Sequence, residues 1–186
     1  MFLDYPLGDA ARPRTFATGG EALTFVLSGL SKVCALPQMK LSWIAAAGPQ
    51  HLVDAAMARL EVIADTFLSV NAPTQWALAP WLAARDTLQQ QIRSRVAENL
   101  ATLDARLRGT HAQRIPLEGG WTAILRVPRD RALANGDSAE FSFAALDGGV
   151  LVQPGDFYGL GPGRCVLSLL TPPDIWREGL QRLPID

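Results

Sequence analysis

Lysine is scarce in this chain: of its 17 basic residues only Lys32 and Lys40 are lysines, and the other fifteen are arginines. An arginine side chain does not lose its proton in proteins, so fifteen of these cations are excluded as nucleophilic amines. Both lysines lie in one nearly uncharged stretch, "VLSGLSKVCALPQMKLSW". Any side-chain chemistry that needs a neutral amine must therefore use this segment.

Cysteine and histidine are equally scarce, with two of each. Cys34 and Cys165 lie far apart and make no disulfide framework, which favours reduced thiols in an intracellular protein. His51 and His111 stand alone, so no metal-ligand spacing exists and we expect no metal site. The 17 basic and 18 acidic residues leave a net charge of -1, which argues against a nucleic-acid partner.

Long apolar runs are also absent. No stretch approaches the roughly 18 residues of a membrane span, and "MFLDYPLGDAARPR" has neither the basic start nor the apolar middle of a signal peptide. We therefore expect a cytoplasmic chain with no membrane contact. Its 186 residues are 48% hydrophobic, which is typical of a globular protein with one good core or two small ones.

The apolar pattern of the first half predicts two strands and then helices. Residues 22–27 and 40–47 read as buried strands that flank a loop carrying Lys32. From residue 50 the period becomes helical, and helices are predicted over residues 50–70 and 85–109. Between them, Pro80 is expected to interrupt or kink another helix.

The second half has shorter elements. The segments "WTAILRV", "VLVQPG" and "RCVLSLL" read as strands, and residues 138–147 and 171–183 read as helices. This order is typical of a small α+β layer. We place the domain boundary in the long helix, which gives domains of residues 1–87 and 88–186.

Lys32 follows an apolar strand in a segment rich in serine and glycine. A lysine amine becomes nucleophilic when burial or a nearby positive charge lowers its pKa, and such a lysine forms Schiff bases with carbonyl compounds. Ser28, Gly29 and Ser31 would let a ligand approach the backbone and would offer hydroxyls to a phosphate, with Lys40 as a nearby point charge. The residues alone leave open the alternative that Lys32 simply points into water.

The segment "SGLSKVCALPQMKLSW" resembles the lysine segment of the class I/II aminotransferases, which have the type I fold of pyridoxal-phosphate enzymes. The resemblance implies that Lys32 is catalytic and holds pyridoxal 5'-phosphate as a Schiff base. It also implies that Ser31, Lys32 and Lys40 are the cofactor-binding residues. Lys40 stands where the family usually has an arginine, and it keeps the charge but loses the bidentate fork.

The segment departs from the family pattern at four positions. Gly29 stands where many members have a serine, and Ala35, Gln38 and Ser42 stand where glycines are common. Further along, "VNAPTQWAL", "LEGGWTAILRVP" and "GVLVQPGDFYGLGPGRCVLSLLTPPDIWREGLQRL" resemble later parts of the family in the same order. The resemblance therefore runs through almost the whole chain.

One residue of the family that binds substrate has no direct counterpart. The family's arginine that binds the substrate carboxylate aligns with Val166. Arg164 lies two residues earlier, and on a strand it would therefore lie on the same face as Val166. The resemblance implies that Arg164 binds the substrate carboxylate in its place. A solvent-facing arginine with no such role is the open alternative.

The resemblance implies an α/β fold: the C-terminal part of the large cofactor-binding domain, with a partial mixed sheet and helices, followed by a small α+β domain. The family is about twice as long, so we expect a truncated C-terminal fragment. Its parent would transfer an amino group between an amino acid and a 2-oxo acid, as a homodimer. Phe2 would fall at the aromatic position of the family's "D-E-x-[FY]" stretch.

A half-length chain should expose a sheet edge and an apolar face. We therefore expect it to be poorly soluble or to form non-native oligomers, and Lys32 to have little selective affinity for the cofactor. The alternatives are an inert aminotransferase-like fragment, a regulatory or interaction domain, and another reaction on the same fold such as β-elimination or decarboxylation.

Overall fold

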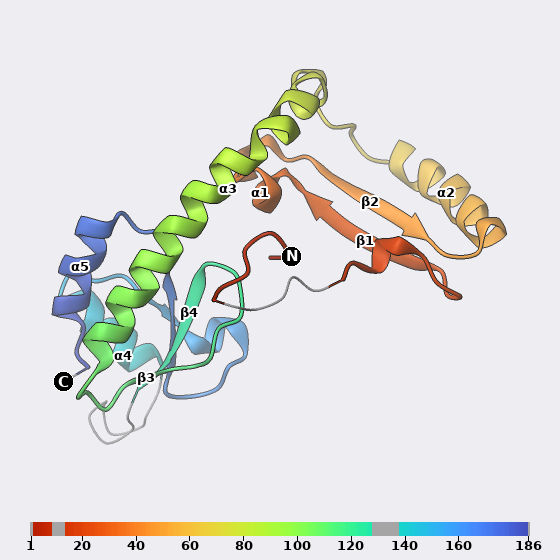
Figure 1. Cartoon of the computed structure of the whole chain (residues 1–186). Helices are drawn as coiled ribbons and strands as arrows, with labels where there is room; N and C mark the ends of the chain where they lie inside the picture. Colours follow the sequence, from red (N-terminus) through yellow and green to blue (C-terminus); the bar gives the residue numbers. More distant parts are fainter. Residues whose placement is uncertain (1, 9–13, 128–137, 186) are drawn as a thin grey trace. The chain divides into compact units, whose positions relative to one another are not determined.

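The computed structural model describes residues 2–8, 14–127 and 138–185, and the chain forms two compact units (Figure 1). Unit 1 comprises Met1–Asp4 and Ala11–Gln90, and unit 2 comprises Tyr5–Ala10 and Gln91–Asp186. Helix α3, Ala72–Leu107, contributes residues to both units.

The sheet of unit 1 consists of two strands, β1 (Thr24–Gly29) and β2 (Ser42–Ala47). Both strands form where the sequence predicts them. They are antiparallel, whereas the predicted partial sheet was mixed. The short connection between them explains the difference, because parallel neighbours need a long crossover and antiparallel ones do not. The helix η1 (Phe16–Thr18) lies before β1.

One face of this two-stranded sheet is exposed. The register places Leu27 directly opposite Ile44, and their exposed fractions are 71% and 45%; Phe25, two residues before Leu27, is 43% exposed. The expectation that both strands are buried is therefore wrong for this face. Strand side chains alternate between faces, and only the opposite face, which carries Trp43, contributes to the core of the unit.

Two helices follow the sheet. Helix α2 spans Gln50–Asp65, and α3 begins at Ala72, where the Asn71 Oδ1 atom accepts a hydrogen bond of 2.9 Å from the Thr74 amide. Asn71 thus acts as the N-cap of α3. Pro80 lies inside α3 and does not end it. The predicted interruption is therefore wrong, and the alternative, a kink at Pro80, stays a prediction. Trp81 and its neighbours pack into the core, and this packing offsets the roughly 3 kcal/mol that an interior proline costs.

Unit 2 contains a four-stranded antiparallel sheet in the order β3-β4-β6-β5. Its strands are β3 (Gln113–Arg114), β4 (Thr122–Arg126), β5 (Gln153–Pro154) and β6 (Arg164–Ser168). Its other elements are α4 (Ser138–Asp147), η3 (Gly155–Tyr158) and α5 (Pro173–Arg182). The predicted strands and helices of this half are confirmed, although the strand expected from "VLVQPG" is only two residues long.

The core of unit 2 lies between one face of this sheet and helices α3, α4 and α5 (Figure 1). Ala123, Leu125, Cys165 and Leu167 alternate toward the helices and are all buried. On the helix side, the main-chain oxygen of Asn99 accepts a hydrogen bond of 2.9 Å from the Trp176 indole, which ties α3 to α5.

The segment around Tyr5 forms an extra edge of this unit. The Gly120 amide donates to the Tyr5 carbonyl at 2.8 Å, and the Leu7 amide donates to the Glu118 carbonyl at 3.0 Å. A Cβ atom on Gly119 would lie 2.9 Å from the Tyr5 oxygen, so this approach requires glycine. The Gly-Gly-aromatic motif therefore has a packing reason, and Trp121 completes it with an edge-on ring contact to Tyr5 at 5.0 Å between centroids.

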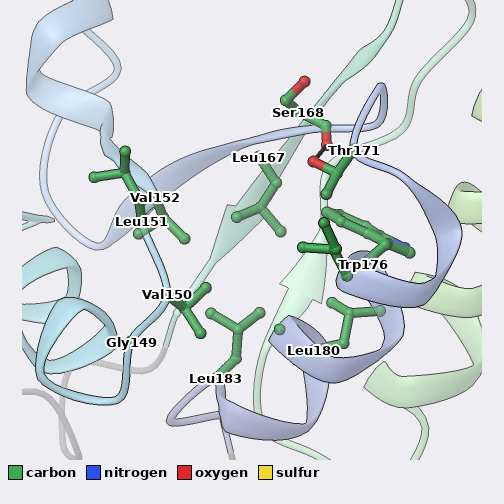
Figure 2. A pocket seen from close by; sticks show the side chains of 12 residues that line it. Gly149, Val150, Leu151, Val152, Leu167, Ser168, Thr171, Trp176, Leu180 and Leu183 are labelled. Atoms are coloured by element: carbon green, nitrogen blue, oxygen red, sulfur yellow. Dashed lines mark hydrogen bonds between the residues drawn. The ribbon is translucent and has the colours of Figure 1, made fainter.

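Unit 2 also contains an apolar pocket of about 260 Å³ beside α5. Figure 2 shows Val150, Leu167, Leu180 and Leu183 converging on it, with the Trp176 ring at one side. Its lining residues include no ionisable side chain. The pocket therefore offers mainly apolar contact area, with the hydroxyls of Ser168 and Thr171 as its polar side chains.

Candidate functional site

Lys32 lies in a short helix and not in a loop. The helix α1 spans Leu30–Val33 and begins directly after β1, so Lys32 is in its last turn. The flanking serine and glycine residues predict a loop here, and that prediction is wrong. The helix forms because its first residue is tied down: the Leu30 amide donates to the Leu41 carbonyl at 3.0 Å, and the Cys34 amide donates back to the Leu30 carbonyl at 3.0 Å.

The position of α1 is fixed by a small core. Leu30, Cys34 and Leu41 are buried together, and residues of α3 that include Trp81 pack against them. The Gln89 side chain, which is itself buried, donates a hydrogen bond of 2.8 Å to the Val33 carbonyl at the end of α1. The backbone that carries Lys32 is therefore held at both ends.

The lysine segment contains unusual backbone conformations. Among the described residues outside glycine, only Ala35 and Lys40 have a positive φ, and both have a φ of 54°. This left-handed region costs a residue with a side chain about 1 kcal/mol, and such strain gathers at functional sites. Ala35 stands where the resembling family commonly has glycine, so the backbone here keeps a conformation that glycine adopts more easily.

Gly29 has a steric reason for lacking a side chain. A Cβ atom at this position would lie 2.8 Å from the Leu41 carbonyl oxygen, which is the same oxygen that accepts the hydrogen bond from Leu30. The serine that many members of the resembling family have here would push the two strands apart. The departure at Gly29 thus follows from how closely β1 and β2 approach in this chain.

The side chains of the predicted cofactor site differ in exposure. Ser31 and Lys32 are half-buried, whereas Lys40 is exposed at the end of the turn η2 (Pro37–Met39). The Lys32 Nζ atom lies 5.8 Å from the centroid of the Phe2 ring, within the range of a cation–π contact. The structure therefore places an aromatic face near the Lys32 amine, inside unit 1.

The predicted substrate ligand belongs to the other unit. Arg164 is the first residue of β6, is half-buried, and donates from Nη1 to the Leu160 carbonyl at 2.6 Å. Val166, which aligns with the family's arginine, is buried and apolar. The roles predicted for Ser31, Lys32, Lys40 and Arg164 thus remain predictions, with three residues in unit 1 and one in unit 2.

The two thiols have the properties of core residues. Cys34 donates a long hydrogen bond of 3.6 Å to the Trp81 carbonyl, and burial raises its pKa, with Arg85 opposing this shift. Burial raises the pKa of the Cys165 thiol to about 12. A reactive cysteine needs a lowered pKa, so neither thiol is a candidate nucleophile.

Within residues 2–8, 14–127 and 138–185, no group of three or more histidine, cysteine, aspartate or glutamate side chains is placed to hold a metal ion. Of the helices in this part of the chain, none has the length and apolar character needed to cross a bilayer.

The sequence alone does not predict the role of Gln89 or the contact of Phe2 with Lys32. Gln89 lies in the polar run "QQQ" of a long helix, where nothing in the sequence separates a buried glutamine from a solvated one. Phe2 is 30 positions before Lys32 in the sequence, and the pairing depends on how residues 2–4 lie against unit 1. Only the family pattern, which has an aromatic residue at this position, could have indicated it.

Comparisons with known proteins found similarity in structure only. No protein-family model matches the chain, and no curated protein matches it. The chain is similar to a double mutant of the Thermus thermophilus aspartate aminotransferase, with a TM-score of 0.78, 19% identity, and coverage of 97% of this chain and 45% of that one.

Two further solved structures give the same result. The aromatic aminotransferase from Pyrococcus horikoshii has a TM-score of 0.79 at 22% identity, over 98% of this chain and 48% of that one. The aspartate aminotransferase from Thermotoga maritima has a TM-score of 0.74 at 19% identity, over 98% and 44%. The chain thus has a mixed α/β structure similar to the aminotransferase fold, and it spans less than half the length of these structures.

Proposed function

We propose that this chain is the C-terminal half of a pyridoxal-phosphate-dependent aminotransferase, with Lys32 as its catalytic lysine. The observation that carries the proposal is the Lys32 segment: a half-buried amine on a helix held at both ends, followed by two strained non-glycine residues. The parent would be a cytoplasmic homodimer that acts on an amino acid and a 2-oxo acid. The structural likeness to aminotransferases supports this reading.

The residues present match two groups of the cofactor, its aldehyde and its phosphate. Lys32 offers an amine for an aldehyde, Ser31 a hydroxyl for a phosphate, and Lys40 a positive charge. When bound, pyridoxal phosphate supplies an electron sink that stabilises a carbanion on the substrate. Lys32 would hold the cofactor, release it to the substrate amine, and then move a proton as a general base through Nζ.

The remaining assigned residues would bind anionic groups. Lys40, at a left-handed position, would meet the phosphate as a point charge and not as a fork. Arg164 would bind the substrate carboxylate. The contact of Lys32 with Phe2 would position the amine without offering it a hydroxyl partner.

The test exploits the fact that the chain has only two lysines. The complete polypeptide that contains this segment is treated with pyridoxal phosphate and borohydride, and the labelled peptide is identified by mass spectrometry. We expect the label on Lys32, with the exposed Lys40 as the internal control, and loss of transamination in Lys32→Arg. Equal labelling of the two lysines would favour the inert fragment or interaction domain instead. Normal turnover by Lys32→Arg would show that Lys32 is not the catalytic lysine.

A further inference from the structure

The apolar pocket of unit 2 beside α5 is large enough to hold a small molecule. Its volume of about 260 Å³ exceeds the roughly 150 Å³ of an apolar cavity that binds benzene. Val150, Leu167 and Leu180 point toward this space in Figure 2. A molecule of the size of a substituted benzene ring therefore fits, and its binding would remove apolar side chains from water.

One wall of the pocket is held in place by a buried asparagine. The Asn99 side chain donates hydrogen bonds of 3.0 Å to the Leu169 carbonyl and 2.8 Å to the Thr171 carbonyl. Its main-chain oxygen accepts the 2.9 Å hydrogen bond from the Trp176 indole. Thr171 and Trp176, which both line the pocket, are thus positioned before a ligand arrives, and a preformed site loses less entropy on binding.

The pocket is apolar at one end and carries hydroxyls at the other. Figure 2 shows Leu183 at the apolar end and Ser168 with Thr171 at the other. The Thr171 Oγ1 atom donates to the Ser168 carbonyl at 3.2 Å, so this oxygen can still accept a hydrogen bond from a ligand. The pocket's lining has no ionisable side chain, and a charged ligand would therefore lose its hydration without gaining a counter-ion.

A glycine inside α5 keeps the pocket open. Gly179 is four residues after Ile175 and three after Trp176, so the three lie on one side of the helix, and all of them line the pocket. A Cβ atom on Gly179 would lie 3.9 Å from the Val150 Cγ1 atom, which is an ordinary contact and not a clash. Packing therefore does not require this glycine, although glycine weakens a helix relative to alanine. Its structural consequence is space in the pocket.

We propose that this pocket binds a small uncharged molecule that has an aromatic ring and one hydrogen-bond donor, of the size of a substituted phenol. The ring would pack against the apolar wall that includes Trp176, and the donor would meet the Thr171 hydroxyl. The pocket lies in unit 2 and involves neither Lys32 nor Arg164. The proposal therefore goes beyond the proposed function and does not depend on it.

Titration calorimetry of the full chain with p-cresol at pH 7, where the phenol is uncharged, tests the pocket. We expect saturable binding that Gly179→Leu weakens at least tenfold, because the new side chain occupies the volume that the ligand needs. Gln181→Leu is the matched control. It adds the same side chain to the same helix at an exposed position outside the pocket, and it should leave binding unchanged.

Gly179→Ala separates a filled pocket from a folding defect. Alanine fits at this position without a clash and favours the helix, so the thermal unfolding midpoint should not fall. The affinity for p-cresol should lie between those of the wild type and Gly179→Leu. A lower midpoint together with unchanged affinity would show that the glycine serves folding and not the pocket.

Two further probes test the ligand class. The charged 4-methylbenzoate should bind at least tenfold more weakly than p-cresol. Thr171→Val removes the acceptor and should weaken p-cresol about fivefold, whereas toluene, which has no donor, should bind the variant and the wild type equally.

The outcomes that contradict the proposal are distinct. No saturable binding of p-cresol, or equal weakening by Gly179→Leu and Gln181→Leu, overturns the pocket. Binding of 4-methylbenzoate as tight as that of p-cresol, or Thr171→Val without effect on p-cresol, overturns the ligand class.

Discussion

The sheets of the two units differ in how far their apolar side chains are buried. In unit 2, Leu125 and Cys165 lie opposite each other on a face that helices cover, and both are fully buried. In unit 1, Leu27 and Ile44 lie opposite each other in the same way, and both are exposed. The same antiparallel pairing thus yields a closed core in one unit and, in the other, a largely exposed apolar face that α2 borders at Ile44.

The distribution of core residues follows from this difference. Among the described residues, 23 apolar side chains are buried, and only four of them, Leu30, Cys34, Leu41 and Ala56, belong to unit 1. Burial of apolar area is the main source of stability. Unit 2 therefore holds most of the stability, while unit 1 is organised around the small core beneath Lys32.

The uncovered face also has a consequence in solution. Exposed contiguous apolar surface favours association with other molecules or with further chain, and a two-stranded sheet is marginal without packing on a face. The expectation of poor solubility and non-native oligomers stays a prediction, and Phe25, Leu27 and Ile44 are the residues that would cause it.

The largest effect is expected from a tryptophan in the closed core. Trp176 is 7% exposed and donates a hydrogen bond to the main-chain oxygen of Asn99. Trp176→Ala should lower the free energy of unfolding by about 3–5 kcal/mol, because it removes a large buried side chain and leaves a cavity. Urea unfolding followed by circular dichroism measures this.

The matched control is Trp76→Ala, since Trp76 is 86% exposed on the unit 1 part of α3. An exposed side chain should change the free energy of unfolding by no more than about 0.5 kcal/mol. A loss comparable to that of Trp176→Ala would mean that the unit 1 surface is covered in solution, and the comparison of the two units would then fail.

The sequence predicted the elements well because their signals are local. The alternation in "WTAILRV" and the helical spacing after residue 50 reflect burial of one face, and β4 and α2 form there. The sequence predicted a similarity to the aminotransferase fold from short motifs that occur in a fixed order. Such motifs identify a chain path even where the overall identity is only 19–22%.

Other features depend on register and on tertiary contacts, which no local pattern encodes. The opposition of Arg126 and Arg164 requires the pairing of strands 38 positions apart in the sequence. The helix at Lys32 forms because the Leu41 carbonyl accepts the Leu30 amide, and serine and glycine alone read as a loop. The apolar composition around Leu27 predicts a buried strand, but composition does not determine which face of a strand is covered by other elements.

A second test uses the single buried cysteine in each unit. Cys34 in unit 1 is 1% exposed and Cys165 in unit 2 is 0% exposed, so both react with a thiol reagent only after local opening. Regions with few buried contacts open at lower free energy. We expect Cys34 to be labelled about a hundredfold faster than Cys165 in native buffer, which corresponds to about 2.8 kcal/mol.

Single-cysteine variants make this readout specific. Cys165→Ala reports on Cys34, Cys34→Ala reports on Cys165, and both thiols should react at similar rates in urea. Equal labelling rates under native conditions would contradict the difference in stability between the units, and faster labelling of Cys165 would reverse it.

The smallest expected effect is a pH dependence that comes from the Cys165 thiol in the closed core. Burial raises the pKa of Cys165 from 9.0 to about 12. Because the folded pKa is the higher one, the stabilisation is fully present below pH 9 and is lost as the pH rises from 9 to 12. Between pH 7.5 and pH 10, the titration of this thiol should therefore lower the free energy of unfolding by about 1.4 kcal/mol.

Urea unfolding of the wild type and of Cys165→Ala at the two pH values isolates this contribution. Every other group titrates equally in both proteins, so the wild type should lose about 1.4 kcal/mol more than the variant between pH 7.5 and pH 10. The same loss in both proteins would mean that the Cys165 thiolate reaches water without unfolding. The sheet of unit 2 would then be as open as the sheet of unit 1.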